Sequence, residues 1–157
     1  MSTLEQAIAI AAKAHKGQVD KAGAPYVLHP LRIMLRVSTT EERIVAVLHD
    51  VVEDCGVSLK DLRVEGFPEV VIEAINSVTR RPEESYEDFV RRAASNPIGR
   101  RVKLADLEDN SDLSRIANPS ARDHKRIAKY RRAIETIEAF EGGNHLEERY
   151  AGETPGT

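Results

Sequence analysis

The amino-acid sequence predicts an all-α protein, a bundle of about eight helices with no significant sheet. Apolar residues recur at helical spacing through most of the chain, and no segment sustains the apolar–polar alternation of a strand. Capping residues, Pro and Gly separate the periodic segments from one another. The predicted helices span residues 4–15, 31–37, 41–56, 58–62, 68–78, 85–94, 98–113 and 121–140.

Local signals mark the ends of these helices in order. Residues 17–25 form a loop that contains Gly and Pro, and Pro30 suits the first turn of the second helix. Residues 38–40, followed by acidic residues, cap a third helix that runs through His49-Asp50 and ends near Gly56. The later boundaries carry comparable signals: Ser58 with Asp61, Phe67-Pro68, Ser85, Asn96-Pro97, Ser120 and, at the end of the last helix, Gly142-Gly143.

The composition favours a single globular domain, expected over residues 1–141, followed by a polar, flexible tail at residues 142–157. The net charge of −3 and the lack of a strong basic patch argue against nucleic acid as a partner. No apolar run is long enough to cross a membrane, no signal-peptide pattern is present, and the single cysteine, Cys55, excludes an internal disulfide. We therefore expect a cytoplasmic protein, and the sequence leaves open whether it forms a homo-oligomer.

The third predicted helix carries an unusual polar face. At about 100° per residue, its apolar residues share one arc, and the opposite arc holds His49, Asp50, Glu53 and Asp54. A solvated face is one interpretation, and it accounts well for the carboxylates. The other is a metal site, because a divalent cation would relieve the repulsion among crowded carboxylates and accept an imidazole as ligand.

Two further segments offer ligands of the same kinds. His29 precedes Pro30 among apolar residues, where a lone histidine is commonly a satisfied core residue. Asp106 follows an apolar turn, with Asn110 one turn later, and its ordinary role would be an ion pair with Lys103 or a neighbouring arginine. Together with His49 and Asp50, they make a set of two imidazoles and two carboxylates, which suits Mn²⁺, Fe²⁺ or Zn²⁺.

Four sequence blocks, in this order, resemble the HD-domain metal-dependent phosphohydrolases. The likeness is closest to the (p)ppGpp hydrolase domain of RelA/SpoT-type enzymes of the stringent response and to small stand-alone alarmone hydrolases. It covers roughly residues 5–135. The blocks are Ala14-His15-Lys16-Gly17-Gln18, Pro25-Tyr26-Val27-Leu28-His29-Pro30, Leu48-His49-Asp50-Val51-Val52-Glu53-Asp54, and Lys103-Leu104-Ala105-Asp106 with Asn110.

The resemblance implies a helical HD-domain bundle and a specific reaction. The family removes pyrophosphate from the 3′ position of (p)ppGpp, a phosphorylated nucleotide. It implies Mn²⁺ held by His29, His49, Asp50 and Asp106, with Fe²⁺ or Zn²⁺ as alternatives. Glu53 and Asp54 match the pair that handles the attacking water. The residues that would meet the substrate are Lys21, Asn110, Lys103 and Tyr130, although Lys103 could instead be a structural partner of Asp106.

The chain departs from the family pattern at the nucleotide-binding loop. The family reads Arg-Lys-Ser-Gly-Glu-Pro-Tyr where this chain has Asp20-Lys-Ala22-Gly-Ala-Pro-Tyr, so the arginine that packs on guanine is replaced by a carboxylate. In the last block an Arg and a His of the family are replaced by Leu107 and Asp109. Three alternatives therefore stay open: an HD phosphohydrolase acting on a deoxynucleotide or NADPH, a catalytically silent nucleotide-binding module, and a metal-free helical bundle.

Overall fold

The computed structural model describes the backbone of residues 2–150 and the side chains of residues 2–143. Within this part of the chain it contains nine helices and no sheet; a single β-bridge joins Val19 and Pro25. The prediction of an all-α protein is confirmed. The helices are α1 Leu4–Ala14, α2 Leu28–Arg36, α3 Thr40–Leu48, α4 Val51–Asp54, α5 Leu59–Val64, α6 Glu69–Ser77, α7 Tyr86–Ser95, α8 Pro97–Asn110 and α9 Ala121–Tyr150.

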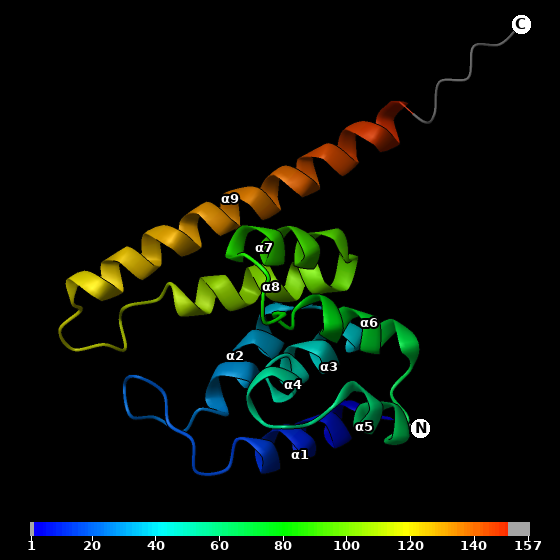
Figure 1. Ribbon diagram of the computed structural model, residues 1–157, viewed down its shortest axis with the longest axis vertical. Coiled ribbons are helices and arrows are strands. Elements are labelled where there is room, and N and C mark those ends of the chain that lie inside the picture. Colours follow the sequence, from blue (N-terminus) through cyan, green and yellow to red (C-terminus); the bar gives the residue numbers. More distant parts are fainter. Residues whose placement is uncertain (1, 151–157) are drawn as a thin grey trace, which may run out of the picture.

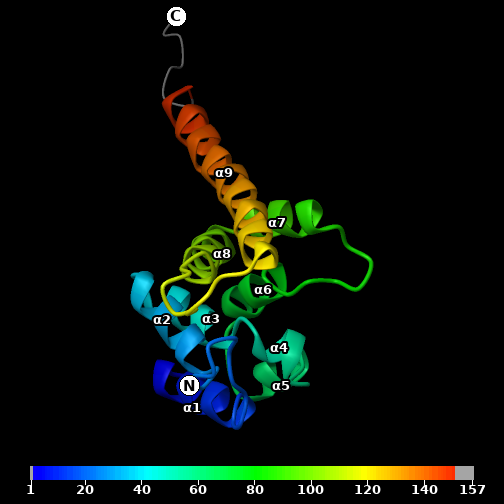
Figure 2. The same ribbon diagram turned by 90° about the vertical axis from the view of Figure 1, so that its left-hand side faces the viewer.

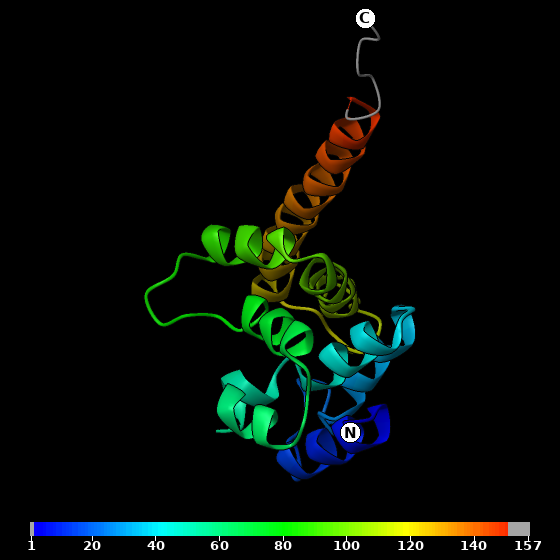
Figure 3. The same cartoon turned by 90° about the vertical axis from the view of Figure 1, so that its right-hand side faces the viewer.

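The helices form two layers that share α8. In the lower layer of Figure 1, α3 packs against α1, α2, α6 and α8, and its segment 45–48 is fully buried. In the upper layer, α7, α8 and α9 enclose a second apolar cluster that includes Leu107 and Ile137. Figure 2 and Figure 3 show α9 running along α7 and α8 and extending away from the rest of the molecule. Because α8 contributes to both clusters, it fixes one layer against the other.

The third predicted helix is wrong in one respect, because the structure divides it at His49-Asp50. α3 ends at Leu48 and α4 begins at Val51. The expected division into a buried and a solvated arc is also too simple, since Ala46 and His49 are buried together with the apolar residues. The reason is that helices surround α3 on several sides, so little of its surface is left for solvent.

The predicted end of the last helix at Gly142-Gly143 is also wrong, because α9 continues to Tyr150. A glycine ends a helix when it adopts a left-handed conformation. Neither glycine is among those with a positive φ. The remainder of the predicted flexible tail, residues 151–157, lies outside the described residues.

Most of the predicted helix caps are formed. The side chains of Ser58, Ser85 and Asn96 each accept a hydrogen bond from a backbone N–H in the first turn of the helix that follows. α8 ends at Asn110 rather than residue 113, and α2 begins at Leu28, so that His29 and Pro30 both lie in its first turn.

None of the helices in the described segment combines the length and apolar character needed to cross a bilayer.

Arg92 fastens the loop between α6 and α7. Its guanidinium donates to the Glu84 carboxylate at 2.7 and 2.9 Å and to the backbone carbonyls of Asn76 and Thr79 at 2.7 and 2.6 Å. The hydrogen bonds from Arg92 lower the pKa of Glu84 to about 2. The Arg92 guanidinium therefore provides hydrogen-bond donors both for a carbonyl group at the end of α6 and for the loop that follows it.

We predict that Arg92→Gln lowers the free energy of unfolding by about 2–3 kcal/mol, because several charge-assisted hydrogen bonds are lost together. Urea denaturation monitored by circular dichroism measures this change. Arg91→Gln is the matched control, since Arg91 is exposed. Equal stability of the two variants would contradict the role given to Arg92.

Candidate metal centre

Two buried imidazoles from different helices face one another where α2, α3 and α8 meet. His29 lies in the first turn of α2 and His49 directly follows α3, with ring centroids 5.4 Å apart. The Nδ1 atom of His29 lies 2.7 Å from Asp109 Oδ2, and that of His49 lies 2.7 Å from the carbonyl oxygen of Ala46. A carboxylate and a carbonyl can only accept, so each Nδ1 carries a hydrogen, and in the neutral imidazole Nε2 is the nitrogen with the free lone pair.

The two predicted carboxylates lie next to these Nε2 atoms. Asp106 Oδ1 is 3.0 Å from His29 Nε2 and 3.6 Å from His49 Nε2. Asp50 Oδ2 is 3.1 Å from His49 Nε2 and 3.9 Å from His29 Nε2. Ligand atoms of His29, His49 and Asp50 all lie within 4.8 Å of one another. The structure thus brings together all four residues of the predicted set.

Neighbouring side chains hold both carboxylates in place. The Tyr26 hydroxyl donates to Asp50 Oδ2. Lys103 Nζ lies 3.0 Å from Asp106 Oδ2, and Asn110 Nδ2 donates to Asp106 Oδ1 at 2.8 Å. Asp106 and Asn110 are four residues apart on α8, so the helix places the two side chains on one face.

The charges of the centre are strongly coupled. Burial opposes protonation of both imidazoles, but neighbouring carboxylates outweigh it. Asp106 and Asp109 raise the pKa of His29, and Asp50 and Asp106 raise the pKa of His49. Burial would raise the pKa of Asp106, but Lys103 and the imidazoles hold that pKa well below its usual range. The carboxylates therefore require positive charge between them.

The residues fit a divalent cation. His49 Nε2 is fully buried and has no hydrogen-bond partner in the described part of the chain, although two carboxylates lie close to it. Such an atom is unfavourable unless something binds it. Mixed nitrogen and oxygen donors of this kind suit first-row divalent metals.

Glu53 and Asp54 lie on α4, immediately beside this centre. Both residues are more exposed than the four ligand candidates. Partial burial and the negative charges of Asp54 and Asp50 raise the pKa of Glu53, and partial burial and Asp50 raise the pKa of Asp54. A carboxylate with a raised pKa is a better proton acceptor.

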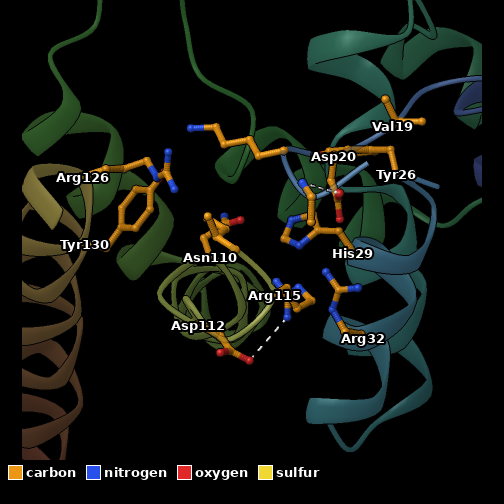
Figure 4. Close-up of a pocket in the computed structure, with 13 residues that line it drawn as sticks. Val19, Asp20, Tyr26, His29, Arg32, Asn110, Asp112, Arg115, Arg126 and Tyr130 are labelled. Atoms are coloured by element: carbon orange, nitrogen blue, oxygen red, sulfur yellow. Dashed lines mark hydrogen bonds and ion pairs between the residues drawn. The ribbon is translucent and has the colours of Figure 1, made fainter. Parts of the chain in front are cut away.

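A cavity of about 260 Å³ opens next to the metal centre. Figure 4 shows α2 and the preceding loop on one side of it, α9 with Arg126 and Tyr130 on the other, and the end of α8 between them. Three of the predicted substrate residues, Lys21, Asn110 and Tyr130, line this cavity. The fourth, Lys103, is not among the described residues that line it, and its ammonium lies 4.7 Å from the centroid of the Phe89 ring.

Three arginines that sequence reasoning did not name also line the cavity: Arg32, Arg115 and Arg126. The sequence could have indicated two of them. Arg32 is three residues after His29 and Arg126 is four residues before Tyr130, so in a helix each arginine shares a face with a predicted site residue. Arg115 lies in the segment after α8, where no periodic pattern indicates its direction. Asp109, the partner of His29, was likewise missed.

Asp20, the residue in place of the family's arginine, lines the same cavity. Its Oδ1 accepts hydrogen bonds from the backbone N–H groups of Ala22 and Ala24 at 2.9 and 3.0 Å. The carboxylate thus closes its own loop as an Asx turn does. It also raises the pKa of Arg32, though less than Asp109 does.

The chain matches no known family model, but it is similar to several curated proteins. It is 32% identical to the guanosine-3′,5′-bis(diphosphate) 3′-pyrophosphohydrolase of Vibrio cholerae, over 89% of this chain and 21% of that protein. It is 31% identical to a GTP pyrophosphokinase of Streptomyces coelicolor, over 87% and 17%, and 28% identical to the bifunctional (p)ppGpp synthase/hydrolase SpoT of Escherichia coli, over 87% and 20%. The chain spans about a fifth of the length of these relatives.

The fold has a solved counterpart. A structure described as a metazoan ortholog of SpoT that hydrolyzes ppGpp superposes with a TM-score of 0.71 at 21% sequence identity, over 87% of this chain and 86% of that one. The resemblance to RelA/SpoT-type (p)ppGpp hydrolases is therefore confirmed in sequence, and the helical bundle is shared with a solved relative.

We predict that Mn²⁺ binds more tightly as pH rises from about 6 to about 8. The pKa of both imidazoles is raised in the metal-free protein, so a cation must displace protons below these pKa values and meets no such competition above them. The dissociation constant should fall by about tenfold per pH unit for each proton displaced. Isothermal titration calorimetry in buffers of different ionisation enthalpy measures both the affinity and the proton release. An affinity independent of pH in this range would contradict the assignment.

Proposed function

We propose that this chain is a metal-dependent hydrolase of a phosphorylated nucleotide, and that it acts as a guanosine 3′,5′-bis(diphosphate) 3′-pyrophosphohydrolase. The observation that carries the proposal is the convergence of His29, His49, Asp50 and Asp106 beside a cavity lined by arginines. The names of the similar proteins support the choice of substrate.

We assign the metal to these two imidazoles and two carboxylates, with Mn²⁺ as the preferred ion and Fe²⁺ or Zn²⁺ as alternatives. When bound, such an ion lowers the pKa of a water molecule and polarises a phosphoryl oxygen. Tyr26, Lys103 and Asn110 keep the two carboxylates oriented through their hydrogen bonds.

Glu53 and Asp54 are the proposed proton acceptors. Water adds to the phosphorus attached to the 3′ oxygen, and the bond between that oxygen and phosphorus breaks. The released pyrophosphate carries the oxygen of the water, and the 3′ oxygen takes up a proton to become the 3′-hydroxyl of GDP. The proton of the water passes to Glu53 or Asp54, whose raised pKa values suit this task. Lys103 contributes through Asp106, because its ammonium is engaged with that carboxylate.

The cavity would hold the rest of the nucleotide. Lys21, Arg32, Arg115 and Arg126 supply positive charge for phosphate groups, since guanidinium groups bind phosphate oxygens in pairs. Tyr130 and Asn110 offer an aromatic ring and an amide to the nucleoside. A small nucleotide substrate agrees with the cytoplasmic location expected from the sequence, which stays a prediction.

We predict that the Mn²⁺-loaded protein releases pyrophosphate from ppGpp and that Glu53→Gln and Asp54→Asn each lower kcat by about 10²–10⁴, as expected for the loss of a proton acceptor. Chromatographic separation of ppGpp, GDP and pyrophosphate measures the rate. The Mn²⁺ affinity of both variants should stay within about threefold of the wild-type value, because neither residue is an assigned ligand. Full turnover in the double variant would overturn the role of this pair.

A second substrate is favoured by Asp20. A carboxylate in place of the arginine removes the planar cation that stacks on guanine in the resembling family, and it adds negative charge to the cavity wall. The protein would then act on another phosphorylated nucleotide, such as a deoxynucleotide or NADPH. A catalytically silent nucleotide-binding module would bind ppGpp tightly and form no product.

We predict that Asp20→Arg lowers KM for ppGpp by about 3–30-fold, since it restores a guanidinium at the base-binding position. The measurement is steady-state kinetics on a panel of ppGpp, deoxynucleoside triphosphates and NADPH. Glu73→Arg is the control, because Glu73 is an exposed acid outside the cavity. If the wild-type protein turns over a deoxynucleotide or NADPH far faster than ppGpp, the second substrate is correct.

A further inference from the structure

Asp109 is a completely buried carboxylate on α8, three residues after Asp106. Sequence reasoning gave it no role, and it stands where the resembling family has a histidine. Burial of a charged group is costly unless partners compensate for it. The partners of Asp109 therefore indicate what it does.

Three cationic or hydrogen-donating side chains converge on Asp109. Oδ2 accepts from His29 Nδ1 at 2.7 Å, and Arg32 donates from Nε to Oδ1 at 2.8 Å and from Nη2 to Oδ2 at 3.0 Å. Arg115 Nη2 lies 3.6 Å from Oδ2 and donates to the Asp109 carbonyl oxygen at 3.2 Å. Burial would raise the pKa of Asp109, but the hydrogen bonds from His29 and Arg32 outweigh it and lower that pKa, so the group is ionised.

These contacts connect two parts of the proposed site. His29 is a candidate metal ligand, whereas Arg32 and Arg115 line the cavity. We propose that Asp109 is a positioning residue that orients the metal ligand His29 and, through the same carboxylate, orients the two arginines toward the substrate phosphates. This inference rests on the proposed function and extends it.

The two imidazoles differ in the way they are held. His49 donates to the neutral carbonyl of Ala46, whereas His29 donates to a carboxylate. A carboxylate is the stronger acceptor, and such a partner fixes the ring orientation and raises the basicity of the ligating nitrogen. Loss of the Asp109 charge should therefore weaken metal binding through His29, without removing any ligand.

The test is a titration of the Asp109→Asn protein with Mn²⁺ in the absence of nucleotide. Electron paramagnetic resonance measures the concentration of free Mn²⁺ at each step. The expected result is an increase in the dissociation constant of about 10–100-fold. Glu108→Gln is the matched control, because Glu108 is exposed on the same helix and pairs only with Arg36 among the described ion pairs, at 3.5 Å. A folded Asp109→Asn protein with wild-type Mn²⁺ affinity would overturn the proposal.

A second variant separates the two tasks of the carboxylate. Arg32→Gln keeps the contact between Asp109 and His29 and removes one cavity arginine. It should raise KM for ppGpp by about tenfold or more and change the Mn²⁺ dissociation constant by less than about threefold. An equal loss of metal affinity in Arg32→Gln and Asp109→Asn would contradict the separate roles.

If Asp109→Asn does not fold, the wild-type protein decides the matter. In the Zn²⁺-loaded protein, nuclear magnetic resonance should show a downfield Nδ1–H proton of His29, assigned by its loss in His29→Gln. Rapid exchange of this proton would overturn the proposal. Neither the Mn²⁺ titration nor the nuclear magnetic resonance measurement uses nucleotide. If Asp109→Asn weakens Mn²⁺ binding as predicted but the wild-type protein does not hydrolyse ppGpp, the result contradicts the proposed function and leaves this inference intact.

Discussion

Each imidazole at the candidate metal centre makes a hydrogen bond through its Nδ1 atom, and this bond fixes the direction in which its Nε2 atom points. Asp109 and the Ala46 carbonyl hold the Nδ1 atoms of His29 and His49, so both Nε2 atoms face Asp50 and Asp106. Buried carboxylates and lone pairs aimed at one place repel each other unless positive charge lies between them. In the proposed site, a divalent cation between the two Nε2 atoms and the two carboxylates supplies that charge.

The helical packing explains how residues distant in sequence reach this place. α3 lies between α1, α2, α6 and α8, and its burial leaves His49 at the end of a helix that cannot shift toward solvent. α8 contributes three residues to the site. Asp109 and Asn110 follow Asp106 by three and four residues, so all three side chains lie on the same side of the helix. The same helix joins the two apolar clusters, so the geometry of the metal centre and that of the cavity depend on one rigid element.

Much of this could be predicted from the sequence. The helical periodicity, the caps and the four ligand candidates are local patterns, and the structure brings the four candidates together. The break between α3 and α4, the continuation of α9 past Gly142, and the roles of Asp109 and Arg115 could not be predicted, because they depend on which surfaces meet in the fold. Lys103 shows the difference well: the sequence allowed either a phosphate or Asp106 as its partner, and the structure places it at Asp106.

The most direct test of the account is a crystal structure of the Mn²⁺-soaked protein with anomalous data collected near the manganese absorption edge. The account predicts one strong anomalous peak within bonding distance, about 2.0–2.3 Å, of His29 Nε2, His49 Nε2 and oxygens of Asp50 and Asp106. An anomalous peak elsewhere or absent in the soaked crystal, with the Nε2 atoms and the carboxylates still in direct contact with one another, would contradict it.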